Sequence, residues 1–561
     1  MRLILYLLLI SSIFTNAQNN YPQDYFGAPL DIPLILSGSF AELRPNHFHS
    51  GLDIKTQQRE GLNVLASASG FVSRIKLAHF GYGKALYITH PNGYTTVYGH
   101  LQRFSPEIEA YIKKQQYEQE SYEIELFPSA ETLPVTKGSI VAYSGNTGGS
   151  GGPHLHFEIR DKLERPMNPM LFGIDIKDTS KPIISTIYVF PLDEKSSINK
   201  SNSKQKLRLI PLKSGDYATE TIEAYGNIGF GIETTDRQDL AANSNGVFNI
   251  QTYLNGNKNF EVDFSLFSFD ESNCINQYLD YEHYVTKRQR IQKLFKLNNP
   301  LSILKPYLND GVLTIQDSVS SIYKIRVSDF KNNESFVSIN IKGKKTTVTN
   351  PVMPKTTPYY ITASQSTNLK SGNVSVDFYP DTFFEDFYID FDVRNDTLTL
   401  HEDVIPTRKN FTINYDISSY RDVDKNKLYI ARLVGSKKYP VYSSTKREGN
   451  ILSTSTKTLG TYGLATDVVN PHISAVNFRD GQWLSNYRFL KLKISDTHSG
   501  ISNYRATVND KWILMEYDYK TQTLTHDFND NIIPEGKNNL KVIVTDNVGN
   551  STTFESVFYR K

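Results

Sequence analysis

The sequence predicts a mainly β protein, and three observations lead to that fold class. Its aromatic residues include 35 Tyr and 31 Phe against only 5 Met, a balance that favours strands over helix bundles. Long stretches alternate polar and apolar residues with a period of two, and clusters of Asn, Asp and Gly separate them as turns would. Two parts of the chain also resemble each other, as repeated modules do. At roughly 150 residues per domain, the 561 residues allow three or four domains.

Charge and hydropathy exclude several classes of protein. The 61 Lys and Arg against 59 Asp and Glu leave a net charge of +2, which gives no electrostatic reason to expect a nucleic acid or an anionic membrane as partner. A hydrophobic fraction of 39% can bury sizeable cores, and a mean hydropathy of −0.42 fits a soluble protein rather than a disordered one. Cys274 is the single cysteine, so no intrachain disulfide can form, and we expect it to be a buried small residue.

Residues 1–17 have the layout of a signal peptide. Arg2 supplies one positive charge, an apolar run extends from Leu3 to Phe14, and small residues end at Ala17, where we expect cleavage. The alternative is a membrane anchor, but about 12 apolar residues fall short of the roughly 20 that span a bilayer. No later stretch is long enough either. The sequence therefore predicts export to the periplasm, cell envelope or extracellular space, with no membrane span.

Residues 18–175 form the first predicted domain, which is rich in glycine and histidine. Seven of the 12 histidines lie between positions 47 and 156. In a strand over residues 48–54, alternation places His49, Gly51 and Asp53 on one face and apolar residues on the other. A histidine and a carboxylate are then presented together, and the glycine between them would leave room for an ion.

Two further strands bring histidines to the same domain. Over residues 154–159, His154 and His156 share one face, about 7 Å apart, and three apolar residues occupy the other. Asn92-Gly93 predicts a tight hairpin turn. Its return strand places Tyr94, Thr96, Tyr98 and His100 on one face, so that His100 can join the same surface.

These residue types suit a zinc site. Catalytic zinc usually has three protein ligands and a position left for water, whose pKa the ion lowers to about 7. Two His and one Asp make such a set, and further histidines nearby would be suited to transfer protons. A single histidine on a strand is more often structural, and strand geometry does not decide whether His154 or His156 is the ligand. The prediction depends on four such residues arriving together, in strands with apolar opposite faces.

Taken together, these segments resemble the lysostaphin-type, or LytM-like, zinc endopeptidases, which cut peptide crosslinks of bacterial peptidoglycan. The similarity extends from His49 to Arg160, and its segments are HSGLDI at 49–54, GFV at 70–72, GYG at 81–83, YGHL at 98–101, SGNTG at 144–148 and GPHLHFE at 152–158. It implies an antiparallel β-sheet catalytic domain and stem or bridge peptides of peptidoglycan as substrates. It also implies that His49, Asp53 and His156 bind Zn²⁺ and that His100 and His154 are the catalytic pair.

The resemblance gives that pair its roles: one draws a proton from the zinc-bound water, and both help to stabilise the tetrahedral oxyanion. His47, His79 and His90 match no functional position of the family, so we expect surface or structural roles for them. The glycine-rich loop 144–152 is either a flexible connection or the wall of a substrate groove.

An insert at 102–134 departs from the family pattern. Ser105-Pro106 can start a helix there, and residues 122–126 then alternate in polarity. A peripheral elaboration is the default interpretation. Because the insert follows His100 directly, a lid or groove extension is the alternative hypothesis.

The rest of the chain is predicted to form three β modules: the first at 176–344, the middle at 345–466 and the last at 467–561. The first and last begin alike, with DTSKPIIS at 178–185 and DVVNPHIS at 467–474, and end alike, with YKIRVSD at 323–329 and LKVIVTD at 540–546. Their alternation and turn spacing are typical of immunoglobulin-like β-sandwiches. The first would contain a charged helical insert at 279–295, and the sequence does not name the type of the middle one. Asp329 and Asp546 are expected to cap turns rather than bind calcium.

Two functions from different classes follow. The leading one is an exported zinc metalloendopeptidase that hydrolyses peptidoglycan crosslinks through a zinc-activated water. The alternative is a non-catalytic envelope-binding or regulatory protein, or an adhesin, built on the β modules. The chain retains all five candidate residues, whereas non-catalytic members of such a family typically lack some ligands, and this favours catalysis.

Overall fold

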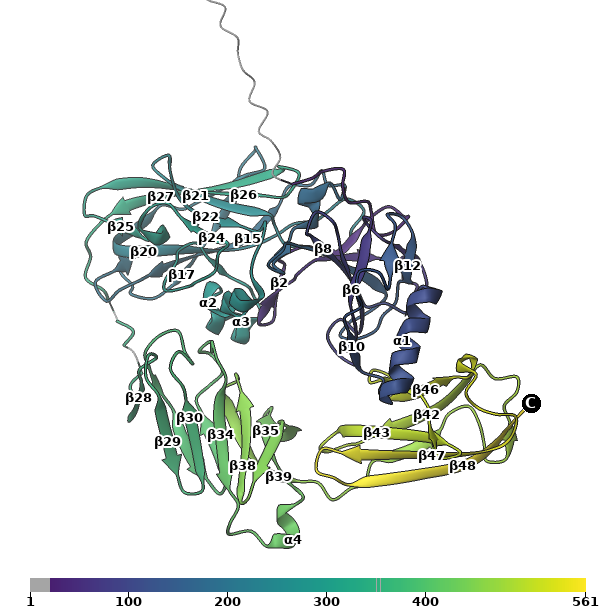
Figure 1. The fold of residues 1–561 in the computed structure, drawn as a ribbon. Coiled ribbons are helices and arrows are strands. Elements are labelled where there is room, and N and C mark those ends of the chain that lie inside the picture. Colours follow the sequence, from purple (N-terminus) through teal and green to yellow (C-terminus); the bar gives the residue numbers. More distant parts are fainter. Residues whose placement is uncertain (1–20, 350, 354) are drawn as a thin grey trace, which may run out of the picture.

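The structure, a computed structural model, describes residues 21–349, 351–353 and 355–561 (Figure 1). The predicted signal peptide lies outside these residues. Strands dominate the described chain, which confirms the mainly β fold class. Helices are short, the longest being α1 (Pro106–Gln119). Among the described helices, none has the length and apolar character needed to cross a membrane.

The first large sheet carries most of the histidine-rich region. Its strands pair antiparallel along the main path, in the order β1 (Leu36–Gly38), β4 (Leu52–Lys55), β13 (His154–Arg160), β8 (Thr95–Gly99), β7 (Lys84–Thr89), β6 (Gly70–Leu77) and β10 (Ile124–Leu126). Leu155, Phe157 and Ile159 are 0% exposed, so one face of β13 is buried in the core as the alternation predicts. A second small sheet joins β5 (Asn63–Leu65), β12 (Ile140–Tyr143) and β9 (Arg103–Phe104).

The insert contains the helix that its sequence predicts. Pro106 stands in the first turn of α1, where its missing N–H costs no hydrogen bond. Ile108 and Ile112 bury the inner face of the helix, and the chain then returns as β10, which pairs with β6. The insert therefore extends the edge of the first sheet.

The first β module is built on a 13-stranded sheet. Its long strands are β15 (Ile183–Pro191), β20 (Ile222–Thr235), β21 (Asn249–Leu254), β22 (Asn257–Asp263), β26 (Ser320–Ser328) and β27 (Glu334–Gly343). The predicted helix over 279–295 is only partly correct. Helix α3 (Tyr281–Lys287) ends at Arg288, which has a left-handed conformation, and β23 (Gln292–Lys293) then pairs with β20 because Ile291 and Leu294 are buried.

The described chain has three large hydrophobic cores and one small cluster of Ala85, Tyr87 and Val97. One is continuous from Phe26 to Ile341 and so joins the histidine-rich region to the first β module. The middle module has its own core, from Ile361 to Tyr462, between sheets that include β34 (Phe411–Asp416) and β39 (Gly460–Thr466). The last has a third core, from Ile473 to Phe558.

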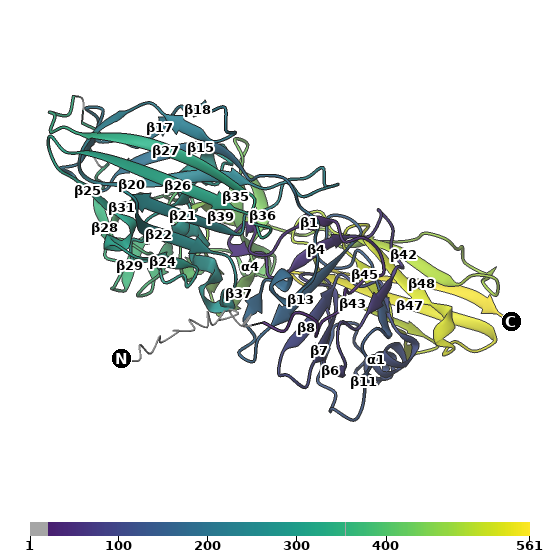
Figure 2. The ribbon, with the colours of Figure 1, turned by 90° about the horizontal axis from the view of Figure 1, so that it is seen from above.

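The last module returns to the first region of the chain. Its strands are β40 (His472–Ala475), β42 (Phe489–Ser495), β43 (Ile501–Val508), β45 (Glu516–Asp518), β46 (Thr523–Asp527), β47 (Gly536–Asp546) and β48 (Ser551–Arg560). Figures 1 and 2 show the chain curving round so that this module lies beside α1. The last module thus contacts the first region of the chain through the insert.

Candidate active site

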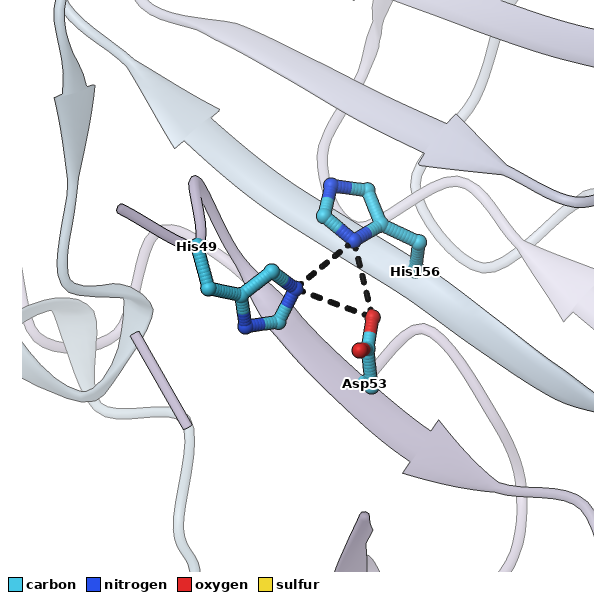
Figure 3. A group of neighbouring side chains, drawn as sticks. All are labelled: His49, Asp53 and His156. Carbon is cyan, nitrogen blue, oxygen red and sulfur yellow. Dashed lines mark hydrogen bonds and ion pairs between the residues drawn. The ribbon is translucent and has the colours of Figure 1, made fainter. Parts of the chain in front are cut away.

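Three side chains converge at the junction of β4 and β13 (Figure 3). His49 Nε2 lies 3.0 Å from Asp53 Oδ1 and 3.0 Å from His156 Nδ1, and the distance from His156 Nδ1 to Asp53 Oδ1 is 2.9 Å. All three residues are at most 5% exposed. The structure therefore brings together the three residues that were predicted as zinc ligands.

Strand pairing accounts for most of this convergence. Asp53 of β4 stands directly opposite His156 of β13, so their side chains share one face of the sheet. The expected strand over 48–54 begins only at Leu52, and His49 reaches the cluster from the segment before it. The interpretation of Gly51 was wrong: a Cβ there would lie 2.3 Å from the carbonyl oxygen of Phe157. Glycine at this position allows a close approach to β13 and does not make room for an ion.

The second nitrogen of each ligand-candidate ring is held by a protein acceptor. His49 donates from Nδ1 to the Ser39 carbonyl at 2.7 Å, which leaves Nε2 facing the cluster. His156 donates from Nε2 to Glu158 Oε1 at 2.7 Å, which leaves Nδ1 facing it. Such outer partners fix the tautomer and orientation of metal-ligating imidazoles.

Glu158 is the centre of this outer layer. The carboxylate is 0% exposed, and it accepts hydrogen bonds from the hydroxyls of Ser50 and Tyr82 and from Nε of Arg160 at 2.6 Å. Burial raises its pKa, but Arg160 and His156 outweigh that effect and keep the pKa well below its usual range. Glu158 is therefore a buried anion whose charge is compensated.

The cluster has strongly shifted acid–base properties. Burial lowers the pKa of His49 to about 4. Burial would also lower the pKa of His156, but the hydrogen bonds of its ring to Asp53 and Glu158 raise it to about 9. Burial would raise the pKa of Asp53, but the surrounding histidines hold it well below its usual range. At neutral pH the metal-free cluster thus contains one imidazolium, one neutral imidazole and one carboxylate.

His154 and His100 border the cluster. Nε2 of His154 lies 3.4 Å from Asp53 Oδ1, while its Nδ1 donates to the Gly152 carbonyl at 2.8 Å. His100 donates from Nδ1 to the Thr147 carbonyl at 2.8 Å, and its ring centroid lies 4.7 Å from that of His154. Burial, followed by the nearby His156 and His154, lowers the pKa of His100 to about 3. Because a carbonyl only accepts, both rings carry a proton on Nδ1, and Nε2 of His154 then faces Asp53.

His100 reaches the site in a different way from the one predicted. Tyr98 pairs with Phe157 and its ring packs on that side chain, so the face that carries Thr96 and Tyr98 is the core face. Simple alternation would send His100 there too. Strand β8 ends at Gly99, however, and His100 has a φ of 59°, a left-handed conformation that turns its ring toward His154. His100 does join the surface that was predicted, but the turn after β8, and not strand alternation, places it there.

The donor set and spacing fit a zinc ion. Two nitrogens and one oxygen about 3 Å apart are close to the edge of about 3.3 Å expected for a tetrahedron with bonds of 2.0–2.1 Å. The three donor atoms form one of the groups in the described residues that could hold a metal ion. The buried partners Ser39 and Glu158 complete the pattern that ligating imidazoles require.

A groove of about 810 Å³ opens beside the cluster. Two walls line it: residues 32–37 with Arg44 on one side, and the glycine-rich stretch 149–153 on the other. A Cβ at Gly151 or Gly152 would meet nothing within 4 Å, so no side chain at these positions projects into the open space of the groove. Of the two interpretations of the 144–152 loop, the groove wall fits this arrangement. No described residue of the 102–134 insert lines the groove, and the insert instead contacts the last β module.

Sequence reasoning missed several residues of the site. Glu158 and Arg160 alternate with His156 along β13, and this alternation was the signal that could have indicated them. Tyr82, whose ring stacks on His156 at 4.8 Å, gave no such signal. Nor did Arg44, whose guanidinium pairs with Asp53 Oδ2.

The remaining residues singled out in the sequence lie apart from the cluster. His47 is exposed, while His90 is 3% exposed and hydrogen-bonded to Ser69 and Thr96. His79 stacks on Tyr122 of the insert. Cys274 is buried, as expected for a small core residue.

Comparison with known proteins supports the resemblance inferred from the sequence. Residues 47–117, which include His49, Asp53 and His100, match Peptidase family M23, and this confirms a LytM-like region in the chain. Residues 358–467 match the Zu5-like domain, which supplies a type for the middle β module.

Relatives resemble only part of the chain. The DD-carboxypeptidase/endopeptidase Mpg of Neisseria meningitidis serogroup B is 35% identical over 122 residues, 22% of this chain and 22% of that protein. An uncharacterized metalloprotease of Haemophilus influenzae is 33% identical over 134 residues, 24% of this chain and 23% of that protein. The match thus spans less than a quarter of the length of either relative.

Solved structures also match about a quarter of the chain. The catalytic domain of the prophage-encoded M23 protein EnpA from Enterococcus faecalis is 23% identical, with a TM-score of 0.19, and covers 27% of this chain and 97% of that one. The catalytic domain of lysostaphin from Staphylococcus simulans is 21% identical, with a TM-score of 0.18, and covers 24% of this chain and 90% of that one.

Proposed function

We propose that this chain is an exported zinc metalloendopeptidase that hydrolyses peptide crosslinks of bacterial peptidoglycan. The observation that carries the proposal is the convergence of His49 Nε2, Asp53 Oδ1 and His156 Nδ1 beside two further imidazoles, those of His154 and His100, whose Nδ1–H groups are held by backbone carbonyls. We further propose that residues 18–175 form the peptidase domain, after a signal peptide at 1–17. The first and last β modules are then immunoglobulin-like sandwiches that follow it.

His49, Asp53 and His156 hold Zn²⁺ in this proposal. The ion would supply Lewis acidity and a water of lowered pKa at the floor of the groove. Ser39 and Glu158 keep the two imidazoles in the tautomers that ligation requires. Arg44 takes the second oxygen of Asp53, so that one carboxylate oxygen remains for the metal.

His154 acts as the general base. Its Nε2 faces the cluster and its Nδ1–H is fixed by Gly152, so the ring can accept a proton from water at Nε2 and then donate it to the leaving amine. Burial lowers the pKa of His100 to about 3, which makes it a poorer proton acceptor. Its free Nε2 orients the attacking water by accepting a hydrogen bond.

The groove suits an extended peptide. It is open beside the cluster, and Gly151 and Gly152 let a substrate backbone come close. The relative Mpg is named for carboxypeptidase and endopeptidase activity, which supports a substrate of peptidoglycan type. Net charge gives no reason to add a nucleic acid or membrane lipid as partner.

Digestion of purified peptidoglycan tests the function. Mass spectrometry should identify released crosslink fragments with the zinc-loaded protein, and none with His156→Ala, which should also lose about one zinc per chain. His154→Ala should keep the zinc and lose most of the rate. His47→Ala is the matched control, because that exposed ring bonds only its own loop. A His154→Ala protein that digests as fast as the parent would disprove its role as base.

The alternative is an envelope-binding or regulatory protein, or an adhesin, built on the β modules. Its expected result is retention of intact peptidoglycan without release of any fragment, by the parent and by His156→Ala alike. Release that requires His156 excludes this alternative.

A further inference from the structure

A second cluster of carboxylates lies where the first β module meets the peptidase region. Asp178 precedes β15, Asp236 follows β20 and Asp329 follows β26, and one oxygen from each lies within 4.8 Å of the others. Segments far apart in sequence therefore bring three acidic groups to one point.

Two buried oxygen atoms at this point lack a partner. Gln238 is 6% exposed and its Oε1 has no hydrogen-bond partner among the described residues, and the same holds for Oδ1 of Asp236, which is 2% exposed. Both residues line a cavity of about 20 Å³, together with Asp178 and Asp329. Such a cavity has room for one water-sized sphere. A buried amide oxygen without a donor is costly, and a cation would satisfy it.

The surroundings provide little positive charge. Lys331 is the one basic residue among those that line the cavity, and its Nζ pairs with Asp175 at 2.6 Å. Burial, with the neighbouring carboxylates, raises the pKa of Asp236 to about 8. A bound cation would relieve this repulsion.

We propose that Asp178, Asp236, Asp329 and Gln238 bind one calcium ion. All the donors are oxygens, the ligands of hard cations. With Ca–O distances of about 2.4 Å, oxygens around one ion stand at most about 4.8 Å apart, and one oxygen from each of the three carboxylates lies within that distance of the others. Calcium tolerates irregular coordination, whereas magnesium demands a near-ideal octahedron. Asp329 also accepts hydrogen bonds from the backbone and side-chain amides of Asn333, which confirms the predicted capping role; calcium binding, which was not expected here from the sequence, is the proposal.

The repeat-equivalent cluster in the last module does not support the same proposal. Asp467, Asp496 and Asp546 also lie within 4.8 Å of one another, and Asp496 is half-buried there as Asp178 is in the first cluster. Both oxygens of Asp467 accept backbone N–H groups, from Val469 and Ser499. Burial raises the pKa of Asp467, but these bonds and the one from the Ser499 hydroxyl outweigh that effect and lower it, whereas the pKa of Asp236 is raised.

The calcium site is close to the zinc-ligand candidates but separate from them. Ser39, which lines the cavity, accepts the Gly246 N–H at Oγ (2.9 Å) and the His49 ring N–H at its carbonyl (2.7 Å). The inference does not depend on the proposed peptidase function, because calcium binding has its own readout.

Thermal unfolding with CaCl₂ as the probe tests the site in the metal-stripped full-length mature chain. At about 5 mM CaCl₂, above the dissociation constants of about 10⁻⁴–10⁻³ M of extracellular calcium modules, the midpoint should rise by about 5 °C. MgCl₂ should have less than about a fifth of that effect. Asp236→Asn should abolish the rise. Glu233→Gln, on the same strand and outside the cavity, should keep it, and so should His156→Ala, which lacks a proposed zinc ligand.

An equal rise in Asp236→Asn, an equal rise with MgCl₂, or no rise in the parent would overturn the proposal. If Asp236→Asn does not fold, equilibrium dialysis of the parent with radioactive calcium decides the matter. About one calcium per chain supports the site, and none overturns it.

Discussion

The first and last β modules both contact the histidine-rich region, but only the first shares its hydrophobic core. Phe267 of the first module is 0% exposed, and its ring lies 5.4 Å from those of Phe40 and Phe48, within the continuous hydrophobic core. The last module has a separate core, and its contacts combine polar pairs, such as that between Lys113 and Asp530, with aromatic contacts, such as that between Phe80 and Tyr519 at 4.7 Å. The shared buried core makes the first module an inseparable part of the fold, whereas we expect the last module, which has its own core, to be able to detach.

The two modules also reach opposite sides of the candidate site. Gly246 of the first module bonds Ser39, whose carbonyl holds the His49 ring. In the last module, Tyr519 donates to the Gly148 carbonyl at 3.2 Å and Lys520 donates to the Asn146 carbonyl at 2.6 Å. The loop between those two carbonyls contains Thr147, which holds His100. We therefore expect loss of the Gly246–Ser39 contact to affect metal binding. Loss of the contacts from Tyr519 and Lys520 should affect turnover alone.

The largest effect is expected from Phe267→Ala. Truncating a fully buried Phe costs about 3–5 kcal/mol, and here the loss would fall on the core shared by both parts. Chemical denaturation should show a lower free energy of unfolding, and the bound zinc should fall with it. Phe127→Ala, at a side chain that is 70% exposed, is the control. An unchanged zinc content in a clearly destabilised Phe267→Ala protein would refute the shared-core interpretation.

Asp530→Asn tests the polar contact. The Asp530 side chain is 2% exposed and accepts hydrogen bonds from Lys113 and from the Tyr117 hydroxyl at 2.6 Å. Losing the charge should weaken docking by about 2 kcal/mol, because hydrogen bonds to charged groups are the stronger kind. Small-angle scattering should show a larger radius of gyration while zinc binding stays unchanged. Asp510→Asn, an exposed change in the same module, should leave the radius as it is.

The metal-ligand candidates should set the pH dependence of zinc binding. They lie on the side of the site that the first module supports through Ser39. With the pKa of His156 at about 9 and that of His49 at about 4, the metal-free site carries one proton that zinc must displace at pH 7. Affinity should therefore rise about tenfold per pH unit up to about pH 9. Titration calorimetry in buffers of different ionisation enthalpy should count about one proton released.

The same raised pKa has a consequence for the metal-free fold. Protonation of His156 stabilises the metal-free folded protein. This contribution is complete below about pH 6.5, the ordinary pKa of histidine, and is lost as the pH rises through about 9. Both pH effects should be identical in Asp530→Asn. A shifted proton count in that variant would mean that the last module also acts on the metal side.

Much of the site could be predicted from the sequence because strand periodicity is local. The alternation in residues 154–159 correctly put His154 and His156 opposite an apolar face. Alternation failed at His100, since a left-handed residue after β8 reverses the expected face. Alternation also misassigned Gly51. Glycine is needed there because the backbone of β13, more than 100 residues away in the sequence, approaches too closely for a Cβ.

The contacts between modules could not be predicted in this way. In the sequence, Phe267 is one apolar residue among many. Its partners Phe40 and Phe48 are identified only in the folded chain. The lid hypothesis for the insert at 102–134 depended on its position directly after His100 in the sequence. In the folded chain its helix instead provides Lys113 and Tyr117 to the last module.

The smallest effect is expected from Lys520→Ala, which gives the sharpest test of the turnover side. The Lys520 side chain is exposed and its bond to the Asn146 carbonyl is screened by water, so removing it should cost about 0.5–1 kcal/mol at most. Looser positioning of Thr147, and with it of His100, should lower kcat of the proposed peptidase about two- to five-fold at unchanged zinc affinity. Lys511→Ala, another exposed lysine of the same module, is the matched control. A loss of zinc affinity with kcat unchanged would show that the two modules do not act on separate sides of the site.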